Sequence, residues 1–196
     1  MSRAERERQM LAVAEEVFAE RGYHAASMDE IAERVGVSKP MLYEYFGSKD
    51  GLMRACTDRL KSELLDATRT AVEKADGPED GLRRGLVAYF AFSERHAKAW
   101  EMLVSEGAAL RELSTEAEAT RMQQSDFIAV ALAANAPQAE PERLDAYAAI
   151  LVGACERLTL WRRRHPDVTA EQAAEYVMDV IWTGFATAVP EKPTTI

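Results

Sequence analysis

VGVSKPMLYEYFGSKDGL, residues 35–52, sets helix-breaking glycine and proline beside two tyrosines in a chain that is otherwise patterned as helices. Gly36 stands where a left-handed residue ends a helix, and Ser38 stands where the next helix takes its N-cap. Pro40 falls in the first turn of that helix, where its missing N–H has no intrahelical partner to lose. The stretch therefore predicts a tight turn followed by a short helix over residues 38–45.

Two helices are predicted before this stretch. Apolar residues spaced three and four apart run through residues 3–21, and Gly22 stands where that helix ends. Ser27 and Glu30 have the spacing of a capping box, which starts a second helix that reaches about residue 34. Three helices in about 45 residues, the last two joined by a glycine turn, make a helix-turn-helix.

The rest of the chain also reads as helical. Ser48 starts a long fourth helix that reaches about residue 73, and residues 75–81 are expected to form a loop. Further helices are expected from residue 82 and at residues 98–107, 110–135, 141–164 and 169–188. We therefore expect an all-α fold of about nine helices, with a helix-turn-helix domain at 1–50, a larger helical domain at 51–190 and a flexible tail at 191–196.

Composition is that of a soluble globular protein, since 47% of the 196 residues are hydrophobic and 29% are charged. Cys56 and Cys155 lie far apart in the sequence, so neither a disulfide framework nor a zinc site is expected. No apolar run approaches the roughly 20 residues that span a bilayer, and the charged N-terminus lacks a signal-peptide pattern. We expect a cytoplasmic protein with no membrane segment, no metal and no cofactor.

Net charge by itself does not indicate a nucleic-acid partner. The chain carries a formal charge of −9, of which residues 1–56 hold −2, with eight Lys and Arg against ten Asp and Glu. Nucleic-acid-binding domains are usually marked by a basic patch, and the first helices show none in their total charge. Any such function must therefore be argued from the geometry of the short helix.

The outer side of the short helix is polar and aromatic. Met41, Leu42 and Phe46 are placed to anchor its inner side, which leaves Lys39, Tyr43 and Tyr45 facing outward. Tyrosine hydroxyls beside a cation suit contacts to phosphate, which position a protein on a DNA duplex. The same spacing fits ordinary half-buried aromatic residues at a helix corner, and the residues alone leave both readings open.

SMDEIAERVGVSKPMLYEYFGSKDGLM, residues 27–53, resembles the DNA-binding signature of the TetR family of bacterial transcriptional repressors. The shared pattern is a Ser or Thr cap, an acidic DEIA segment, a GVS turn, a Leu-Tyr-x-x-Phe helix and a Ser-Lys-Asp start to the next helix. The match covers about residues 8–56. The later chain resembles the family only in its all-helical layout, its length and its two terminal helices.

The resemblance implies a homodimer that binds a pseudo-palindromic operator as a repressor and is released by a small molecule. In the bacterial cytoplasm it would be associated with the nucleoid when bound. Ser27 would cap the second helix and touch phosphate, and Tyr43, Tyr45 and Lys49 would contact the DNA backbone. The residues nearest base edges would be Ser38, Lys39, Pro40 and Met41, with Pro40 and Met41 contacting thymine methyl groups.

Two positions depart from the family pattern. The family often has Thr or a small residue where Met41 stands, which leaves the operator sequence open. It commonly has Glu where Gly51 stands, a difference that we expect the fold to tolerate.

The last two predicted helices carry apolar stripes with small residues that allow close approach. The resemblance favours a four-helix dimer bundle, and the same stripes also fit an intramolecular core. The residues expected at the dimer interface are Leu151, Leu158, Val177, Val180, Ile181 and Gly184. Arg162, Arg163 and Arg164 end one of these helices, where cations complement the helix dipole and cap carbonyl groups, so a second DNA patch is not proposed there.

Aromatic and sulfur-containing side chains in the larger domain are numerous enough to line a pocket for an apolar effector. The residues expected there are Tyr89, Phe92, Trp100, Met122, Phe127, Tyr147 and Cys155. Such stripes also occur in ordinary helical cores, and the sequence identifies neither the effector nor the operator.

Two other functions were weighed against a DNA-binding regulator. His24, His96 and His165 are scattered and match no metal or nucleophile signature, so an enzyme is not expected. A helical protein-interaction module remains the second alternative.

Overall fold

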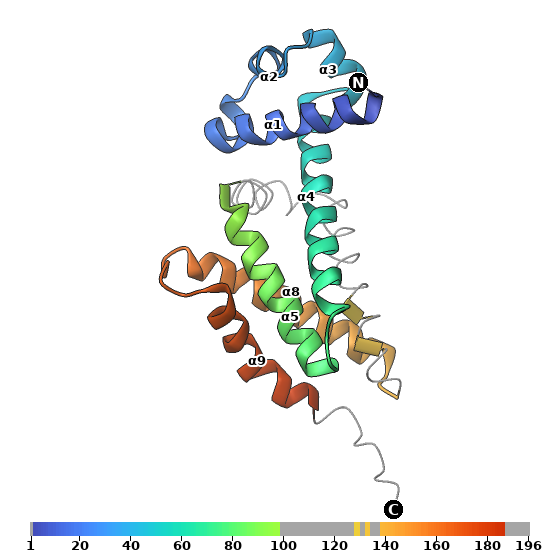
Figure 1. The fold of residues 1–196 in the computed structure, drawn as a ribbon, viewed down its shortest axis with the longest axis vertical. Helices are drawn as coiled ribbons and strands as arrows, with labels where there is room; N and C mark the ends of the chain where they lie inside the picture. The colour runs from blue at the N-terminus through green and yellow to red at the C-terminus, as the bar shows by residue number, and fades with distance from the viewer. Residues whose placement is uncertain (1, 99–127, 130–131, 134–137, 187–196) are drawn as a thin grey trace, which may run out of the picture. The chain divides into compact units, whose positions relative to one another are not determined.

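The computed structural model describes residues 2–98, 128–129, 132–133 and 138–186 (Figure 1). Helices account for all the regular structure in these residues, which confirms the predicted all-α fold. They are α1 (Arg3–Ala25), α2 (Met28–Val35), α3 (Lys39–Phe46), α4 (Lys49–Val72), α5 (Pro78–Arg95), α8 (Pro141–Arg162) and α9 (Ala170–Ala186). Two of the predicted nine helices, at 98–107 and 110–135, fall almost entirely outside the described residues.

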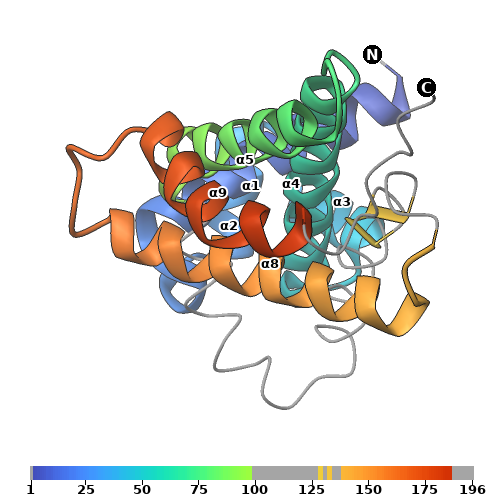
Figure 2. The same cartoon turned by 90° about the horizontal axis from the view of Figure 1, so that it is seen from below.

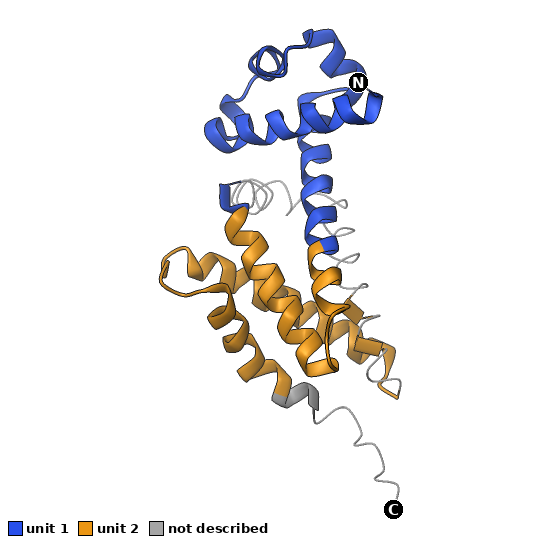
Figure 3. Ribbon diagram, in the orientation of Figure 1, with its two compact units in different colours: residues 1–66, 96–113 blue, residues 67–95, 114–196 orange. Residues whose placement is uncertain are grey.

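The chain divides into two compact units (Figure 3). Unit 1 comprises residues 1–66 and 96–113, and unit 2 comprises residues 67–95 and 114–196. Helix α4 contributes to both units. The predicted domain limits at residues 50 and 190 remain a prediction. Within the described residues, no helix is long and apolar enough to cross a membrane.

Unit 1 has one hydrophobic core made by α1, α2, α3 and the start of α4. Each helix contributes the residues of one face at a spacing of three or four, as an amphipathic helix must. Leu42 is the buried residue of α3 and is fully inaccessible, so it holds this short helix on the core. The other buried members include Met10, Phe18, Met28, Ile31, Leu52 and Cys56.

The glycines of unit 1 sit where the backbone requires positive φ. Gly36 ends α2 with φ 79° and ψ 35°, and its N–H donates to the carbonyl oxygen of Ala32 over 3.0 Å. Gly22 has φ 75° and interrupts α1, but the helix resumes to Ala25 and is longer than predicted. The turn between α2 and α3 therefore follows from a left-handed glycine, as the sequence indicates.

In unit 2, α5 and α9 lie side by side, and α8 packs against both (Figures 1 and 2). Their shared core contains Phe90 from α5, Cys155 from α8 and Val177 from α9. Helix α5 begins at Pro78, so the predicted loop over 75–81 is wrong in its second half. Proline is compatible with the first turn of a helix, and Glu79 and Asp80 in that turn favour a helix start there.

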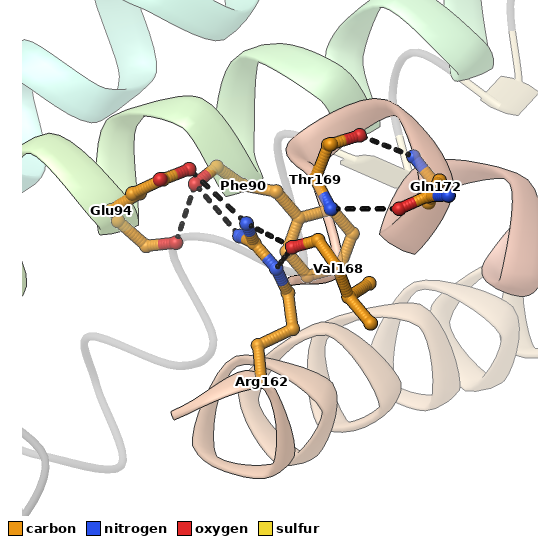
Figure 4. Close-up of polar contacts among 7 residues, drawn as sticks. Phe90, Glu94, Arg162, Val168, Thr169 and Gln172 are labelled. Carbon is orange, nitrogen blue, oxygen red and sulfur yellow. Dashed lines mark hydrogen bonds and ion pairs between the residues drawn. The ribbon is translucent and has the colours of Figure 1, made fainter. Parts of the chain in front are cut away.

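Arg162 links α8 to α5 and to the segment just before α9 (Figure 4). Its Nη2 donates to the carbonyl oxygen of Val168 over 2.9 Å, and its Nη1 donates to that of Phe90 over 3.4 Å. The same guanidinium lies 3.1 Å from a carboxylate oxygen of Glu94, and its side chain is 10% exposed. The predicted role as a cation that caps its own helix is therefore wrong for Arg162, because the side chain turns toward α5 and the start of α9.

Candidate nucleic-acid interface

Ser27 caps α2 as predicted. Its side-chain oxygen accepts a hydrogen bond from the N–H of Glu30 over 3.1 Å. The carboxylate of Glu30 accepts from Arg34 over 2.8 Å and from Arg21 over 3.3 Å. These contacts define the N-terminus of α2 and leave the Ser27 side chain at the surface.

Ser38 occupies the N-cap of α3 with extended backbone angles, but its hydroxyl makes no capping hydrogen bond. Lys39 and Pro40 are the first two residues of the helix, in the first turn as predicted. All three side chains are exposed. The start of α3 is therefore exposed, and the hydroxyl group of Ser38 does not cap the helix.

The exposed face of α3 differs from the predicted one at two positions. Tyr43 is 42% exposed, as predicted, whereas Tyr45 is half-buried and packs against the core of unit 1. Met41 is half-buried against that core, in agreement with its predicted place on the inner side of the helix. Glu44 is exposed and was missed, although it lies one helical turn after Pro40 and the helix period alone places the two on one side.

The two lysines expected to meet DNA both have partners within the chain. Lys39 Nζ lies 2.8 Å from a carboxylate oxygen of Asp29 in α2. Lys49 Nζ donates to the carbonyl oxygen of His24 over 3.3 Å and lies 4.5 Å from the ring centre of Tyr23. Lys49 thus stabilises the end of α1, which is a role that sequence spacing did not indicate.

Two arginines of α1 lie against side chains of α3. The guanidinium carbon of Arg3 is 5.1 Å from the ring centre of Tyr45, and Arg6 Nη1 is 3.7 Å from the sulfur of Met41. Among the described residues, no carboxylate forms an ion pair with either arginine. The first turns of α1 therefore add positive charge beside α3.

The turn from α3 to α4 is closed by Ser48, whose hydroxyl accepts from the N–H of Gly51 over 2.9 Å. A Cβ atom added at Gly51 would overlap the carbonyl oxygen of Phe46. The turn in its present form therefore has room for glycine alone at position 51, and the departure from the family's Glu leaves the all-helical fold intact, as expected.

The predicted effector residues are only partly brought together. Tyr89 and Cys155 belong to the same core cluster, Phe92 is buried, and Tyr147 packs in a separate cluster with Leu144. Burial raises the pKa of the Cys155 thiol to about 12 and raises that of the Tyr89 hydroxyl, so both groups are neutral. The other three, Trp100, Met122 and Phe127, lie outside the described residues.

The residues predicted at the dimer interface differ in how far their side chains are buried within the single chain. Leu151 and Val177 are buried inside unit 2, and Leu158 and Ile181 are half-buried against the same core. Val180 is 79% exposed, and the surroundings of Gly184 lie outside the described side chains. Among the side chains that the structure describes on α8 and α9, the other large exposed apolar residues are Ile150, at 60%, and Tyr176, at 46%, which sequence analysis missed.

Residues 10–56 match the family described as bacterial regulatory proteins, tetR family, and residues 78–184 match the tetracyclin repressor-like C-terminal domain. The chain belongs to the TetR family. The resemblance drawn from the sequence is thereby confirmed, and the matched C-terminal domain extends it to the larger part of the chain.

Solved structures agree with this assignment to the TetR family. A TetR-like transcriptional regulator from Rhodococcus sp. RHA1 is 33% identical, with a TM-score of 0.71 over 95% of this chain and 98% of that one. A tetR-family regulator from Streptomyces coelicolor is 29% identical, with a TM-score of 0.75 over 95% of this chain and 84% of that one.

Curated relatives match over shorter segments. The transcriptional activator FasR of Mycolicibacterium smegmatis is 42% identical over 53% of this chain and 47% of its own length. The transcriptional regulator EthR of Mycobacterium tuberculosis is 30% identical over 57% of this chain and 51% of its own. The chain thus spans about half the length of the curated relatives it matches. All of these proteins are named as regulators, in agreement with the prediction that the chain is not an enzyme.

Proposed function

We propose that this TetR-family chain is a transcriptional regulator that binds a specific, pseudo-palindromic DNA operator as a homodimer. The observation that carries the proposal is the exposed face of α3. Leu42 anchors this helix in the core, while five consecutive or helically adjacent positions stay accessible: Ser38, Lys39, Pro40, Tyr43 and Glu44. A second helix of a helix-turn-helix with such a face lies in the major groove of DNA.

The exposed face supplies each kind of contact that base recognition requires. Lys39 donates hydrogen bonds to guanine, Glu44 accepts from the amino group of cytosine, and Pro40 offers an apolar surface to a thymine methyl group. The half-buried Met41 remains at the edge of this face, supported by Arg6.

Phosphate contacts position the duplex around α3. The hydroxyl groups of Ser27 and Tyr43 and the guanidinium groups of Arg3 and Arg6 are available for this role. Tyr45 and Lys49 contribute to DNA binding indirectly. Tyr45 supports the guanidinium of Arg3, and Lys49 stabilises the end of α1.

Dimerisation is proposed through the exposed apolar residues of α8 and α9. Ile150, Tyr176 and Val180 replace the buried Leu151 and Val177 as the centre of the interface, since a buried side chain cannot contact a second copy. Large exposed apolar residues on two neighbouring helices favour association, and a two-fold dimer presents its two α3 helices to the two half-sites of a palindrome.

The effector site is proposed within unit 2, where α5 and α8 bring polar groups into an apolar core. Tyr89 and Cys155 lie in this core beside Thr159, whose hydroxyl donates to the carbonyl oxygen of Cys155 over 2.9 Å. The proposed effector is a small, mainly apolar molecule with one hydrogen-bonding group, the kind of ligand that an apolar site with few polar groups takes. Binding of this molecule is proposed to release the operator.

Repression is the proposed effect on transcription, in line with the family resemblance. Activation is the second candidate, because the FasR relative is named as an activator. A reporter gene placed behind the selected operator separates the two, since deletion of the regulator raises expression under repression and lowers it under activation.

Selection from a random pool of DNA duplexes tests the main proposal. We expect enrichment of a sequence with two inverted half-sites, whose centres lie about one helical turn or a multiple of it apart. A pool that shows no enrichment at moderate salt would overturn the DNA-binding function.

A further inference from the structure

The ion pair between Lys39 and Asp29 joins the first residue of the proposed recognition helix to the second residue of α2. The 2.8 Å contact is also a hydrogen bond, and it holds the pKa of Lys39 above its ordinary value. The Lys39 side chain is 43% exposed and that of Asp29 is 71% exposed, so both face solvent where DNA would approach. An exposed pair of this kind is weak and exchanges readily with other charged partners.

The pair changes what Lys39 offers to DNA. Attraction to phosphate depends on net charge and acts at long range, and Asp29 cancels most of the net charge of Lys39. Hydrogen bonding to a base edge depends instead on the direction of individual N–H groups. A lysine ammonium has three such donors, and Asp29 occupies one of them. The paired lysine thus loses attraction to phosphate and keeps donors for a base.

We propose that Asp29 is a specificity-determining residue, which lowers the affinity of this chain for arbitrary DNA by holding Lys39 in an ion pair while leaving Lys39 able to read the operator. This inference rests on the proposed DNA-binding function. On arbitrary DNA the pair withholds Lys39 from phosphate, whereas in the operator the remaining donors of Lys39 contact a base acceptor with the pair intact.

Asp29→Asn tests the role of the pair. The probes are the selected operator duplex and a duplex of the same length with scrambled sequence, titrated by fluorescence anisotropy between about 50 and 200 mM salt. We expect the scrambled duplex to bind about 3- to 10-fold more tightly and its log–log salt slope to steepen by up to about 0.9 per subunit. Affinity for the operator should change by less than about 2-fold, so that the specificity ratio falls.

Glu33→Gln is the matched control. Glu33 is exposed one turn after Asp29 on α2, and no ion pair is found for it among the described residues. If Glu33→Gln and Asp29→Asn have equal effects, only bulk charge matters and the proposal is overturned. The proposal is also overturned if Asp29→Asn weakens operator binding and leaves the scrambled duplex unchanged, because Asp29 would then orient Lys39 and not restrain it.

Lys39→Met provides an independent readout. In the wild-type background, where Asp29 already holds Lys39, it should weaken the scrambled duplex less than in the Asp29→Asn background, where it should remove most of the gain. Equal effects in both backgrounds would overturn the coupling. Unchanged melting temperatures verify that the variants are folded. A wild-type chain that binds no duplex would overturn the proposed function itself, which the first titration detects before any variant is compared.

Discussion

Arg162 in α8 donates a hydrogen bond from Nη1 to the backbone carbonyl oxygen of Phe90 in α5, 72 residues earlier in the chain. Its Nε and Nη2 reach the carbonyl oxygen of Val168 at 3.1 and 2.9 Å, just before α9. Thr169 and Gln172 then start α9 with reciprocal hydrogen bonds of 3.0 and 3.2 Å (Figure 4). One nearly buried cation thus satisfies carbonyl groups from two separate parts of unit 2.

Replacing Arg162 should destabilise unit 2. Arg162→Met keeps much of the aliphatic volume but removes both guanidinium donors to the carbonyl oxygen of Val168 and one donor to that of Phe90, which keeps the hydroxyl of Ser93. We expect the free energy of unfolding to fall by about 2–3 kcal/mol, because hydrogen bonds to charged groups are lost in a poorly solvated site. Denaturation followed by tryptophan fluorescence measures this. The exposed Arg164 is the control, and Arg164→Ala should change the value by less than about 0.5 kcal/mol. Equal small changes for both variants would contradict the structural role of Arg162.

Glu15 should make unit 1 less stable as pH rises. Burial raises its pKa from 4.5 to about 7, and Arg59, with Nε 3.8 Å from the carboxylate, offsets this only in part because Glu63 also accepts from it. The folded state therefore binds a proton that the unfolded state has lost, and stability falls between about pH 4.5 and 7.

Glu15→Gln removes the ionisation and should abolish this fall, with a gain on the order of 1 kcal/mol at pH 8 and little change at pH 4. Unfolding curves across this range measure the effect. The exposed Glu7 on the same helix, changed to Gln, should leave the pH dependence as in the wild type. Parallel pH profiles for wild type and Glu15→Gln would contradict the prediction, because folding would then leave the ionisation of the Glu15 carboxyl group unchanged.

Gly51→Ala and Gly153→Ala should have opposite effects. Both residues are helical, and alanine normally favours a helix over glycine by about 1 kcal/mol. A Cβ at Gly153 meets nothing within 4 Å, whereas a Cβ at Gly51 overlaps the carbonyl oxygen of Phe46. We expect Gly153→Ala to raise thermal stability and Gly51→Ala to lower it by about 1–3 kcal/mol. A stabilised Gly51→Ala variant would show that the turn after α3 relaxes without cost.

Val180→Asp should prevent dimer formation. Val180 is 79% exposed in the single chain, so a carboxylate there is harmless to the monomer and unfavourable in an apolar interface. Light scattering should give half the wild-type mass, with unchanged helical circular dichroism, and affinity for a two-site operator should fall at least about 10-fold. Asp179→Asn, at an exposed neighbouring position, is the control and should stay dimeric. An unchanged mass for Val180→Asp would place the interface elsewhere.

Tyr43→Ala should weaken binding to every operator variant by a similar amount. Tyr43 is exposed and lies outside the core, so its loss should leave the fold intact. We expect a cost of about 1–2 kcal/mol, uniform across sequences, because phosphate contacts carry no base preference. Tyr176→Ala in unit 2 is the control for loss of an exposed tyrosine. Its affinity is measured on a duplex that carries a single half-site. Loss that differs strongly between operator variants would instead assign Tyr43 to base recognition.

The sequence by itself determined the helices of unit 1 and the turn that defines the family. Ser27, Gly36 and Pro40 act on backbone groups within one helical turn of themselves. The helix starts and ends that they define can therefore be predicted from the neighbouring residues in the sequence. The same local signals placed the end of α1 too early at Gly22, because they do not show whether a helix resumes after one strained residue.

Only the tertiary structure decided which side chains are available. Lys39 meets Asp29, Lys49 meets His24, and Arg162 meets Phe90, and each pair joins helices that are separate in the sequence. The exposed face of α3 and the exposed residues of α8 and α9 likewise depend on what packs against each helix. Periodicity identifies a helical face, but the burial of that face depends on contacts between residues far apart in the chain.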